Sequence, residues 1–207
     1  MTLFISFEGG EGCGKTTQSK LLAEFLTKNN LPNILTRAPG GVLEAELIRK
    51  VIFDENGANW CPMTELLLQN AARFEQTVKV IQPAINENKI VITDRYLDST
   101  IVYQGMVQNL GVDIVTKLHT MILGDFLPKI TFLLDIEPSM GLTRAQARSD
   151  NNRYDNMDLE FHNKIRASFL EVALLHHSRI IVLDGGLPKE ILHDKIVKHV
   201  NNLLRLF

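Results

Sequence analysis

A glycine-rich segment close to the beginning of the sequence constrains the fold more than any other feature. Residues 9–16 read Gly-Gly-Glu-Gly-Cys-Gly-Lys-Thr and match the spacing G-x-x-x-x-G-K-[ST] of a phosphate-binding loop. The segment follows the short apolar run Leu3–Phe7 and precedes a helical pattern that begins near Lys15, which is the setting that this motif requires. A glycine-rich turn with an incidental lysine is the alternative, but at ordinary glycine usage roughly one chain in a hundred would match by chance. The sequence therefore predicts a strand, a loop and a helix that together bind a nucleoside triphosphate.

The chemistry expected of this loop follows from its backbone. Glycines allow successive N–H groups to turn inward around phosphate oxygens, and the positive end of the helix dipole adds attraction. Lys15 is expected to reach the β- and γ-phosphates, and the Thr16 hydroxyl is expected to bind Mg²⁺. The loop residues that we expect to bind ATP are Gly9, Gly10, Glu11, Gly12, Cys13, Gly14, Lys15 and Thr16.

Short apolar runs alternate with helical patterns along the rest of the chain. The runs are Leu3–Phe7, Asn33–Thr36, Ile90–Thr93, Lys129–Leu134 and Arg179–Leu183. Each is too short for a buried helix, and their continuous apolar character is typical of strands covered on both faces. The helical patterns are Lys15–Leu26, Leu43–Phe53, Met63–Asn88, two pieces within Tyr96–Leu123, Ser139–Ala147, Leu159–His177 and Pro188–Leu204. The third pattern contains Pro83, which we expect to kink or end the helix. This order predicts an α/β fold in three layers, with a five-stranded parallel sheet flanked by helices and wound by right-handed crossovers.

Composition excludes several other classes of protein. The 207 residues are 45% hydrophobic and 22% charged, with a formal net charge of −2, which is typical of a globular domain that buries a core. No overall basic field favours nucleic acid, and no apolar run approaches the ~20 residues of a membrane span. The two cysteines have neither a metal-binding nor a disulfide spacing, which indicates a reducing, cytoplasmic location. We expect one domain over residues 1–207.

A phosphate loop alone leaves three classes of protein open, namely a small-molecule kinase, a GTPase switch and a motor-type ATPase. The sequence has no N-K-x-D motif, which a GTPase would use to read guanine, and a motor ATPase usually needs a longer chain. A kinase also requires a site for a second substrate that bears phosphate, with arginines to hold it.

The segment that follows the run Ile90–Thr93 is a candidate for this second site, because ligands bind at the carboxyl ends of strands in open α/β sheets. Asp94 can hold Mg²⁺ through water or accept a hydrogen bond from a substrate, and Arg95 can bind a phosphate with two hydrogen bonds. A strand that ends in a solvated Asp-Arg turn is an equally plausible interpretation of these two residues alone.

Two polar rows follow on the next helical pattern. Ser99 and Tyr103 are four residues apart, as are Thr100 and Gln104, so the pairs project from adjacent helix faces. A helix that faces only the core would not gather so many hydrogen-bonding groups. Their chemistry is suited to the recognition of a base or a sugar.

Taken together, the motifs resemble those of bacterial thymidylate kinases, within the P-loop nucleoside-monophosphate kinases. The segments that carry the resemblance are Phe7–Gln18, Thr36–Gly41, Ala71–Arg73, Asp94–Tyr96, Ser99, Thr100, Tyr103–Gly105, Gly124–Pro128, Leu133–Asp135 and Arg144–Arg153. Each is weak by itself, but they cover nearly the whole chain in the right order and spacing. The resemblance implies an Mg²⁺-dependent, homodimeric enzyme that transfers the γ-phosphate of ATP to dTMP, giving dTDP on the route to dTTP.

The resemblance also assigns roles to individual residues. Lys15, Asp94, Arg95 and Arg148 are the implied catalytic residues, and Thr16 and Asp94 are the implied metal ligands. Glu11 corresponds to an acidic residue that contacts the deoxyribose 3′-hydroxyl, and Tyr103 to a residue that crowds the 2′ position. Arg37 and Arg95 correspond to residues near the acceptor phosphate, whereas Arg73 corresponds to the arginine that meets the thymine edge. The implied dTMP-binding residues are Glu11, Arg37, Gln69, Arg73, Arg95, Ser99, Thr100, Tyr103 and Gln104.

A polar, arginine-rich segment at residues 144–156 resembles the lid of these kinases. Arg144 and Arg148 are four residues apart, and a solvated basic face is the usual explanation of such a pair. Here the phosphate loop carries the acidic residue Glu11, and in family members of this kind the lid supplies the transition-state arginine. The resemblance therefore implies that Arg144 and Arg148 bind ATP and that Arg148 acts in catalysis; such a residue can contribute roughly 10³–10⁵ in rate.

Three positions depart from the family pattern. Ala38 stands where these kinases have glutamate, Gln146 replaces an arginine found in some lids, and Gln69 stands where an aromatic ring usually stacks on thymine. Phe74 lies five residues further along and cannot occupy the same place on a helix. Two alternatives stay open. One is a different nucleoside-monophosphate kinase or a nucleoside kinase, and the other, suggested by Ala38 and Gln69, is a nucleotide-binding protein of the same fold with weak turnover.

Overall fold

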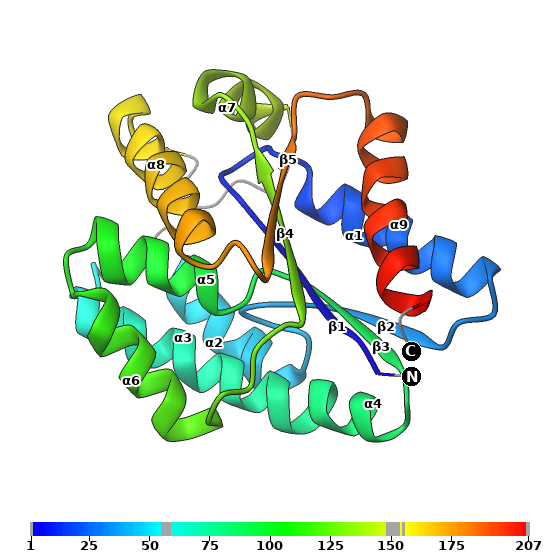
Figure 1. Ribbon diagram of the computed structural model, residues 1–207. Helices are drawn as coiled ribbons and strands as arrows, with labels where there is room; N and C mark the ends of the chain where they lie inside the picture. Colours follow the sequence, from blue (N-terminus) through cyan, green and yellow to red (C-terminus); the bar gives the residue numbers. More distant parts are fainter. Residues whose placement is uncertain (1, 55–58, 148–153, 155, 206–207) are drawn as a thin grey trace.

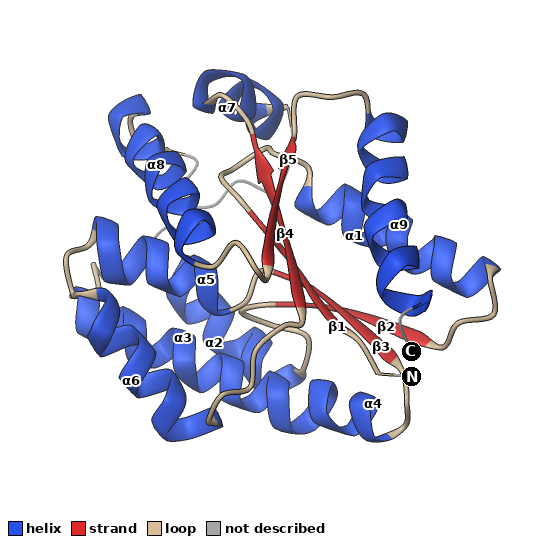
Figure 2. Ribbon diagram, viewed as in Figure 1, coloured by secondary structure: helices blue, strands red, loops and turns tan. Residues whose placement is uncertain are grey.

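Five short strands, one at each predicted apolar run, form a single sheet in the computed structural model, which describes residues 2–54, 59–147, 154 and 156–205. The strands are β1 (Phe4–Glu8), β2 (Asn33–Arg37), β3 (Ile90–Asp94), β4 (Ile130–Asp135) and β5 (Ile180–Asp184). They lie in the order β2-β3-β1-β4-β5, and every neighbouring pair is parallel. The predicted five-stranded parallel sheet is therefore confirmed (Figure 2).

Each strand ends one residue later than its apolar pattern indicates, because that last residue is charged in every case. The five terminal residues are Glu8, Arg37, Asp94, Asp135 and Asp184. Parallel strands end at one edge, and the register pairs Arg37 with Asp94 and Asp135 with Asp184. The sheet thus brings charged side chains together at the edge where α/β folds bind ligands.

Helices cover both faces of this sheet, as Figure 1 shows. On one face, α1 (Lys15–Lys28) and α9 (Lys189–Arg205) pack against Ile5 and Phe7 of β1 and against Leu3, which precedes the strand. On the other face, Phe4 shares a buried cluster with side chains of α3 (Pro62–Gln76) and α8 (Leu159–Leu175). Phe4 and Ile5, adjacent in β1, therefore enter opposite cores, and the strand is buried on both faces along its whole length.

The remaining helices agree with the predicted segments in their positions. They are α2 (Leu43–Phe53), α4 (Gln82–Asn86), α5 (Leu97–Thr100), α6 (Val112–Leu123) and α7 (Pro138–Gln146), with the π-helical segments η1 (Thr77–Ile81) and η2 (Ile101–Val107). The third helical pattern is continuous through α3, η1 and α4, and it changes type at η1, in the turn directly before Pro83. A proline removes one helical hydrogen bond and displaces the carbonyl four residues earlier, so a distortion at this place agrees with the expectation from the sequence.

Among the helices of the described residues, none has both the length and the apolar character that crossing a membrane requires.

Candidate active site

A cleft of about 940 Å³ opens at the carboxyl ends of the central strands. It is lined by most of the residues that the sequence nominates as a site: Glu11, Gly12, Gly14, Lys15, Thr16, Arg37, Gln69, Arg73, Asp94, Arg95, Ser99, Thr100, Tyr103 and Gln104. The cleft extends from the phosphate loop to the buried side chains of α3 and η2. It therefore has the size and position of a site for two substrates.

The phosphate loop is held in a shape that only glycine accommodates well. Gly12 has φ of +69°, and a Cβ there would lie 1.8 Å from the carbonyl oxygen of Gly141, at the beginning of α7. Gly14, at φ of +101°, precedes the first residue of α1, and no side chain caps this helix. The N–H groups at the beginning of α1 are thus available to an anion, as a phosphate site requires.

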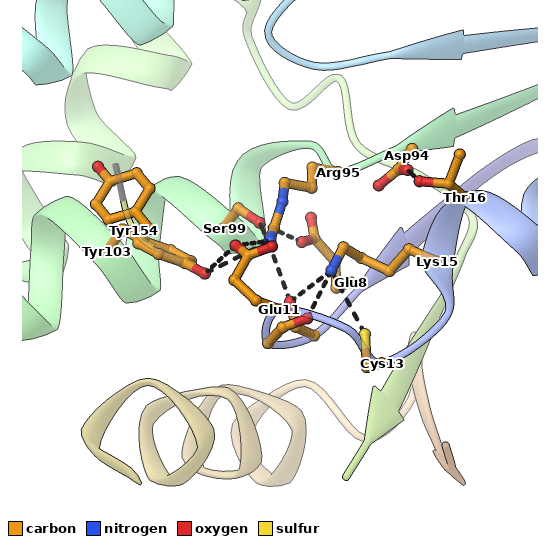
Figure 3. Close-up of polar contacts among 12 residues, drawn as sticks. Glu8, Glu11, Cys13, Lys15, Thr16, Asp94, Arg95, Ser99, Tyr103 and Tyr154 are labelled. Carbon is orange, nitrogen blue, oxygen red and sulfur yellow. Dashed lines mark hydrogen bonds and ion pairs between the residues drawn. The ribbon is translucent and has the colours of Figure 1, made fainter. Parts of the chain in front are cut away.

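Lys15 is folded back onto the phosphate loop. Its Nζ donates hydrogen bonds to the carbonyl oxygens of Gly9 at 3.0 Å and Gly10 at 2.7 Å, and lies 3.4 Å from Cys13 Sγ (Figure 3). These partners are neutral, so a phosphate that offered a full negative charge would compete well for the ammonium group.

Thr16 and Asp94 come from different elements and meet at the edge of the cleft. The Thr16 hydroxyl, on the first turn of α1, donates a hydrogen bond of 2.5 Å to Asp94 Oδ2 at the end of β3. A hydroxyl and a carboxylate oxygen are hard ligands, which Mg²⁺ prefers, usually together with water and phosphate oxygens. This pair fits the metal that the sequence predicts at these two residues.

Arg95 lies at the centre of a polar network on the floor of the cleft. Its guanidinium donates to Ser99 Oγ at 2.8 Å, to Gly9 O at 3.1 Å and to Glu11 Oε1 at 2.7 Å, and the Tyr103 hydroxyl also donates to Glu11 at 3.1 Å. Figure 3 shows these groups converging beside the phosphate loop. Burial by itself lowers the pKa of Arg95, but Tyr103, Glu11 and neighbouring carboxylates more than offset this, and the pKa lies well above its ordinary value. Arg95 therefore remains a fixed positive charge.

Glu8 supports this network from below, and the sequence did not single it out as a site residue. The side chain is 1% exposed and accepts hydrogen bonds from the Tyr96 backbone N–H at 2.7 Å and the Ser99 hydroxyl at 2.5 Å. Burial, followed by the charge of Asp98, raises the pKa of Glu8 to about 7, although Arg95 acts in the opposite direction. The available signal was a charged residue at the end of a mainly apolar strand.

The far end of the cleft is formed by α3 and the segment α5–η2. Arg73 is 2% exposed, and its guanidinium donates to Thr100 Oγ1, to Tyr96 O at 3.4 Å and to Asn70 Oδ1 at 3.1 Å. Burial lowers its pKa, and the electron-rich face of the Tyr96 ring lies 5.5 Å away. The two polar rows predicted from the sequence separate here, because Ser99 and Tyr103 face Arg95 whereas Thr100 faces Arg73.

A model of the thymidylate kinase family matches residues 7–196 of this chain. A thymidylate kinase of Rickettsia rickettsii (strain Sheila Smith) is 40% identical over 199 residues, covering 95% of this chain and 96% of that relative. One of Rickettsia bellii (strain RML369-C) is 40% identical over 199 residues, covering 96% and 95%. The crystal structure of thymidylate kinase from Ehrlichia chaffeensis aligns with a TM-score of 0.76 at 34% identity, covering 96% of this chain and 98% of that one. The chain belongs to the thymidylate kinase family.

Membership of the thymidylate kinase family decides between the classes of protein that the phosphate loop left open. The chain has the P-loop kinase fold and is an ATP-dependent phosphotransferase, not a GTPase switch or a motor-type ATPase.

One arginine of the cleft was not anticipated from the sequence. Arg49 lies on α2, donates to Pro39 O at 3.0 Å and packs its guanidinium 4.8 Å from the centre of the Phe53 ring. Burial, together with the positive charge of Arg37, lowers the pKa of Arg49. Arg49 gave no signal in the sequence because it lies within the helical pattern Leu43–Phe53, and an arginine on an amphipathic helix is ordinarily solvated.

Arg37 and the departure at Ala38 are explained by their neighbours. Arg37 forms two hydrogen bonds with Glu46, at 3.1 and 2.9 Å, and Glu46 also accepts the Gly41 N–H at 2.9 Å. Ala38 is buried and donates its backbone N–H to Asp94 O at 2.9 Å. In this chain, therefore, Glu46 is the carboxylate that orients Arg37.

Some of the predicted ATP-binding residues do not line the cleft. They are Gly9, Gly10 and Cys13 of the loop, and Arg144, which donates to Gly185 O at 2.8 Å in the turn after β5. Arg148 lies outside the described residues, as does most of the predicted lid. From the described part of that segment, Ala147 and Tyr154 line the cleft.

Proposed function

We propose that this protein transfers the γ-phosphate of ATP to dTMP, forming dTDP and ADP. The observation that carries the proposal is the single cleft that joins the phosphate loop, the cations Arg37, Arg49 and Arg95, and the buried polar surface around Arg73. This order of groups suits a donor triphosphate, an acceptor phosphate and a base in line. The names of the Rickettsia and Ehrlichia relatives support dTMP as the acceptor.

In this proposal the protein accelerates the reaction by positioning the two substrates and by stabilising negative charge, because in-line phosphoryl transfer requires no covalent bond between protein and substrate. The beginning of α1 and Lys15 hold the triphosphate, once Lys15 exchanges the carbonyl oxygens of Gly9 and Gly10 for phosphate oxygens. Arg95 stays charged within its network and faces the acceptor phosphate, with Arg37 and Arg49 nearby. These groups offset the negative charge that otherwise keeps two phosphates apart.

Mg²⁺ is the cofactor that we propose for the pair Thr16 and Asp94. When bound, the ion supplies positive charge against the β- and γ-phosphate oxygens. The Thr16 hydroxyl and the Asp94 carboxylate are oxygen ligands 2.5 Å apart, and they would hold it with water completing the shell.

The proposed acceptor site assigns the remaining residues. Arg73, Thr100 and Gln104 would meet the thymine base, whereas Glu11 and Tyr103 would meet the deoxyribose. Gln69 lines the cleft on α3 and would lie against the base. Phe74 is 41% exposed and does not line the cleft, so it does not replace the missing aromatic ring.

The segment at residues 144–156 is proposed as a lid within a single domain of residues 1–207, with Arg148 as the arginine that meets the transition state. Tyr154 lines the cleft and its hydroxyl donates to Glu65 of α3, so this part of the segment is anchored beside the proposed acceptor site.

A homodimer is proposed from the exposed apolar side chains of two adjacent helices. Leu43, Leu47 and Val51 follow each other at four-residue spacing on α2, and Met63 and Leu67 continue this face on the neighbouring α3. An exposed apolar face of this kind is typical of a surface that contacts another protein. The segment Tyr96–Leu110 is also rich in apolar residues, but these lie in the protein's own core and form no exposed face for a partner.

We place the enzyme in the cytoplasm, a proposal supported by its two free thiols, Cys13 and Cys61.

A coupled assay of ADP release tests the proposed reaction. The acceptors are dTMP, dUMP, dCMP, dGMP, AMP and shikimate, each with ATP and Mg²⁺, and we expect clear preference for dTMP. Preference for a different acceptor would support another monophosphate kinase, and tight binding of dTMP without turnover would support a nucleotide-binding protein. Either result would overturn the proposal.

A further inference from the structure

A buried carboxylate lies directly behind the far end of the cleft. Glu65, on α3, is 1% exposed and accepts hydrogen bonds from Gln104 Nε2 at 2.6 Å, from Gln108 Nε2 at 3.3 Å and from the Tyr154 hydroxyl. Each of these three groups donates to Glu65, which is the role that a carboxylate acceptor requires of its neighbours. Glu65 itself does not line the cleft, whereas Gln104 does.

This contact decides which end of the Gln104 amide is available to a ligand. Because Nε2 donates to Glu65, and lies 3.5 Å from the Tyr154 hydroxyl, the NH₂ group is directed into the protein. No donor among the described residues reaches Gln104 Oε1. The amide therefore offers its carbonyl oxygen, an acceptor, to whatever occupies the cleft.

Arg73 places the opposite kind of group on the same wall. Its guanidinium can only donate hydrogen bonds, and it is held in place by Asn70, Tyr96 and Thr100. Thr100 lies one helical turn before Gln104, so the two groups are neighbours on this wall. The far end of the cleft thus presents one fixed donor and one fixed acceptor.

We propose that Glu65 is a positioning residue for base selection, which acts by fixing the orientation of the Gln104 amide. A donor beside an acceptor complements a pyrimidine that carries a 4-oxo group and an N3–H, as thymine and uracil do. Cytosine presents the reverse pattern, an amino group and an unprotonated N3, and would leave buried groups unpaired, which is costly. This inference rests on the proposed function, since it requires the base to occupy this end of the cleft.

The variant Glu65→Gln tests the inference with little change of shape. A glutamine can turn either its carbonyl or its NH₂ toward Gln104, so the Gln104 amide is no longer restricted to one orientation. We expect the dTMP:dCMP ratio of kcat/KM to fall by about tenfold or more, which corresponds to about 1.4 kcal/mol. The dTMP:dUMP ratio should stay within about twofold of wild type, because these bases share the 4-oxo group and N3–H.

Three further variants separate orientation from simple structural damage. Gln108→Leu removes another donor from the same carboxylate and should leave both ratios unchanged. Glu65→Asp, a second variant in case Glu65→Gln does not fold, withdraws the acceptor and should lower only the dTMP:dCMP ratio. In a Gln104→Leu background, Glu65→Gln should have no further effect on that ratio, since the two residues act as one unit.

The inference is overturned if folded Glu65→Gln retains the dTMP:dCMP ratio of wild type, or if both ratios fall together. It is also overturned if Glu65→Gln and Gln104→Leu lower the dTMP:dCMP ratio independently. A wild-type protein that does not prefer dTMP would instead contradict the proposed function, so the two failures are distinguishable.

Discussion

Replacement of Glu8 by glutamine should stabilise the protein at neutral pH, although it removes a negatively charged carboxylate that accepts hydrogen bonds beneath the cleft. Burial and the charge of Asp98 raise the pKa of Glu8 from 4.5 to about 7 in the folded protein. An acid with a higher pKa when folded binds more protons in the folded than in the unfolded chain across this range. Its contribution to the free energy of unfolding is therefore fully present below about pH 4.5 and is lost as the pH rises toward 7.

The size of the effect follows from the same shift. One pKa unit corresponds to about 1.36 kcal/mol, so ionisation of Glu8 costs the folded state at most about 3 kcal/mol by pH 8. The introduced glutamine would mimic the protonated acid, because its carbonyl can accept the Tyr96 N–H and its NH₂ can donate to Ser99 Oγ. We expect Glu8→Gln to match wild type near pH 4.5 and to be more stable by about 2–3 kcal/mol near pH 8.

Urea unfolding at half-unit pH steps from 4.5 to 8 measures this difference directly. His119 complicates the wild-type curve, since burial and the charge of Arg73 lower its pKa to about 4, so its contribution to stability is lost as the pH falls from 6.5 toward 4. Subtracting the wild-type from the variant curve cancels His119 and isolates Glu8. Parallel curves, or a variant that loses stability relative to wild type as the pH rises, would refute the reasoning.

The remaining predictions concern the cleft itself. Calorimetric titration should show that Gln69→Phe binds dTMP more tightly than wild type, because stacking of an aromatic ring on a base contributes ~1–3 kcal/mol. Arg73→Ala should lose more affinity for dTMP than any change at Gln69. Unchanged binding in folded Gln69→Phe would mean that another group already covers the base. Arg148→Ala should lower kcat at least tenfold with little change in the KM for ATP, whereas Lys15→Ala should impair both, and a change in KM alone would reduce Arg148 to an ATP ligand. Asp94→Asn should raise the Mg²⁺ concentration needed for half-maximal turnover by about tenfold or more, and an unaltered Mg²⁺ titration would exclude Asp94 as a metal ligand.

The central strands were predictable from the sequence because both of their faces are buried, so the apolar runs Leu3–Phe7, Ile90–Thr93 and Lys129–Leu134 mark their positions. The ends of the strands were not predictable in the same way, because the apolar pattern stops one residue before the charged residue that ends each strand. That residue is the functionally interesting one at β1 and β3, where Glu8 and Asp94 extend the strand into the site. The pattern of apolar residues indicates only which positions are buried. A charged residue that is buried among specific partners cannot be distinguished, in the sequence, from the first residue of a solvated loop.

The site residues were predictable where a local motif fixes the backbone. They were less predictable where contacts between distant parts of the chain determine which side chains reach the site. The phosphate loop assigned Lys15 and Thr16 by local spacing alone, whereas the family resemblance implied that Thr16 and Asp94 share a metal. Arg49 and Glu65 were missed because their positions on α2 and α3 resemble ordinary polar residues of amphipathic helices. Only the folded chain places Arg49 over Phe53 and Glu65 behind Gln104.

The central claim, that this cleft transfers phosphate from ATP to dTMP, is tested most directly by competition. The protein is given Mg²⁺, limiting ATP labelled at the γ-phosphate, and an equimolar mixture of dTMP, dUMP, dCMP, dGMP and AMP, and the labelled diphosphates are then separated. The ratios of product report the ratios of kcat/KM under one set of conditions. The account predicts that dTDP carries most of the label; label chiefly in any other diphosphate, or remaining in ATP, would contradict it.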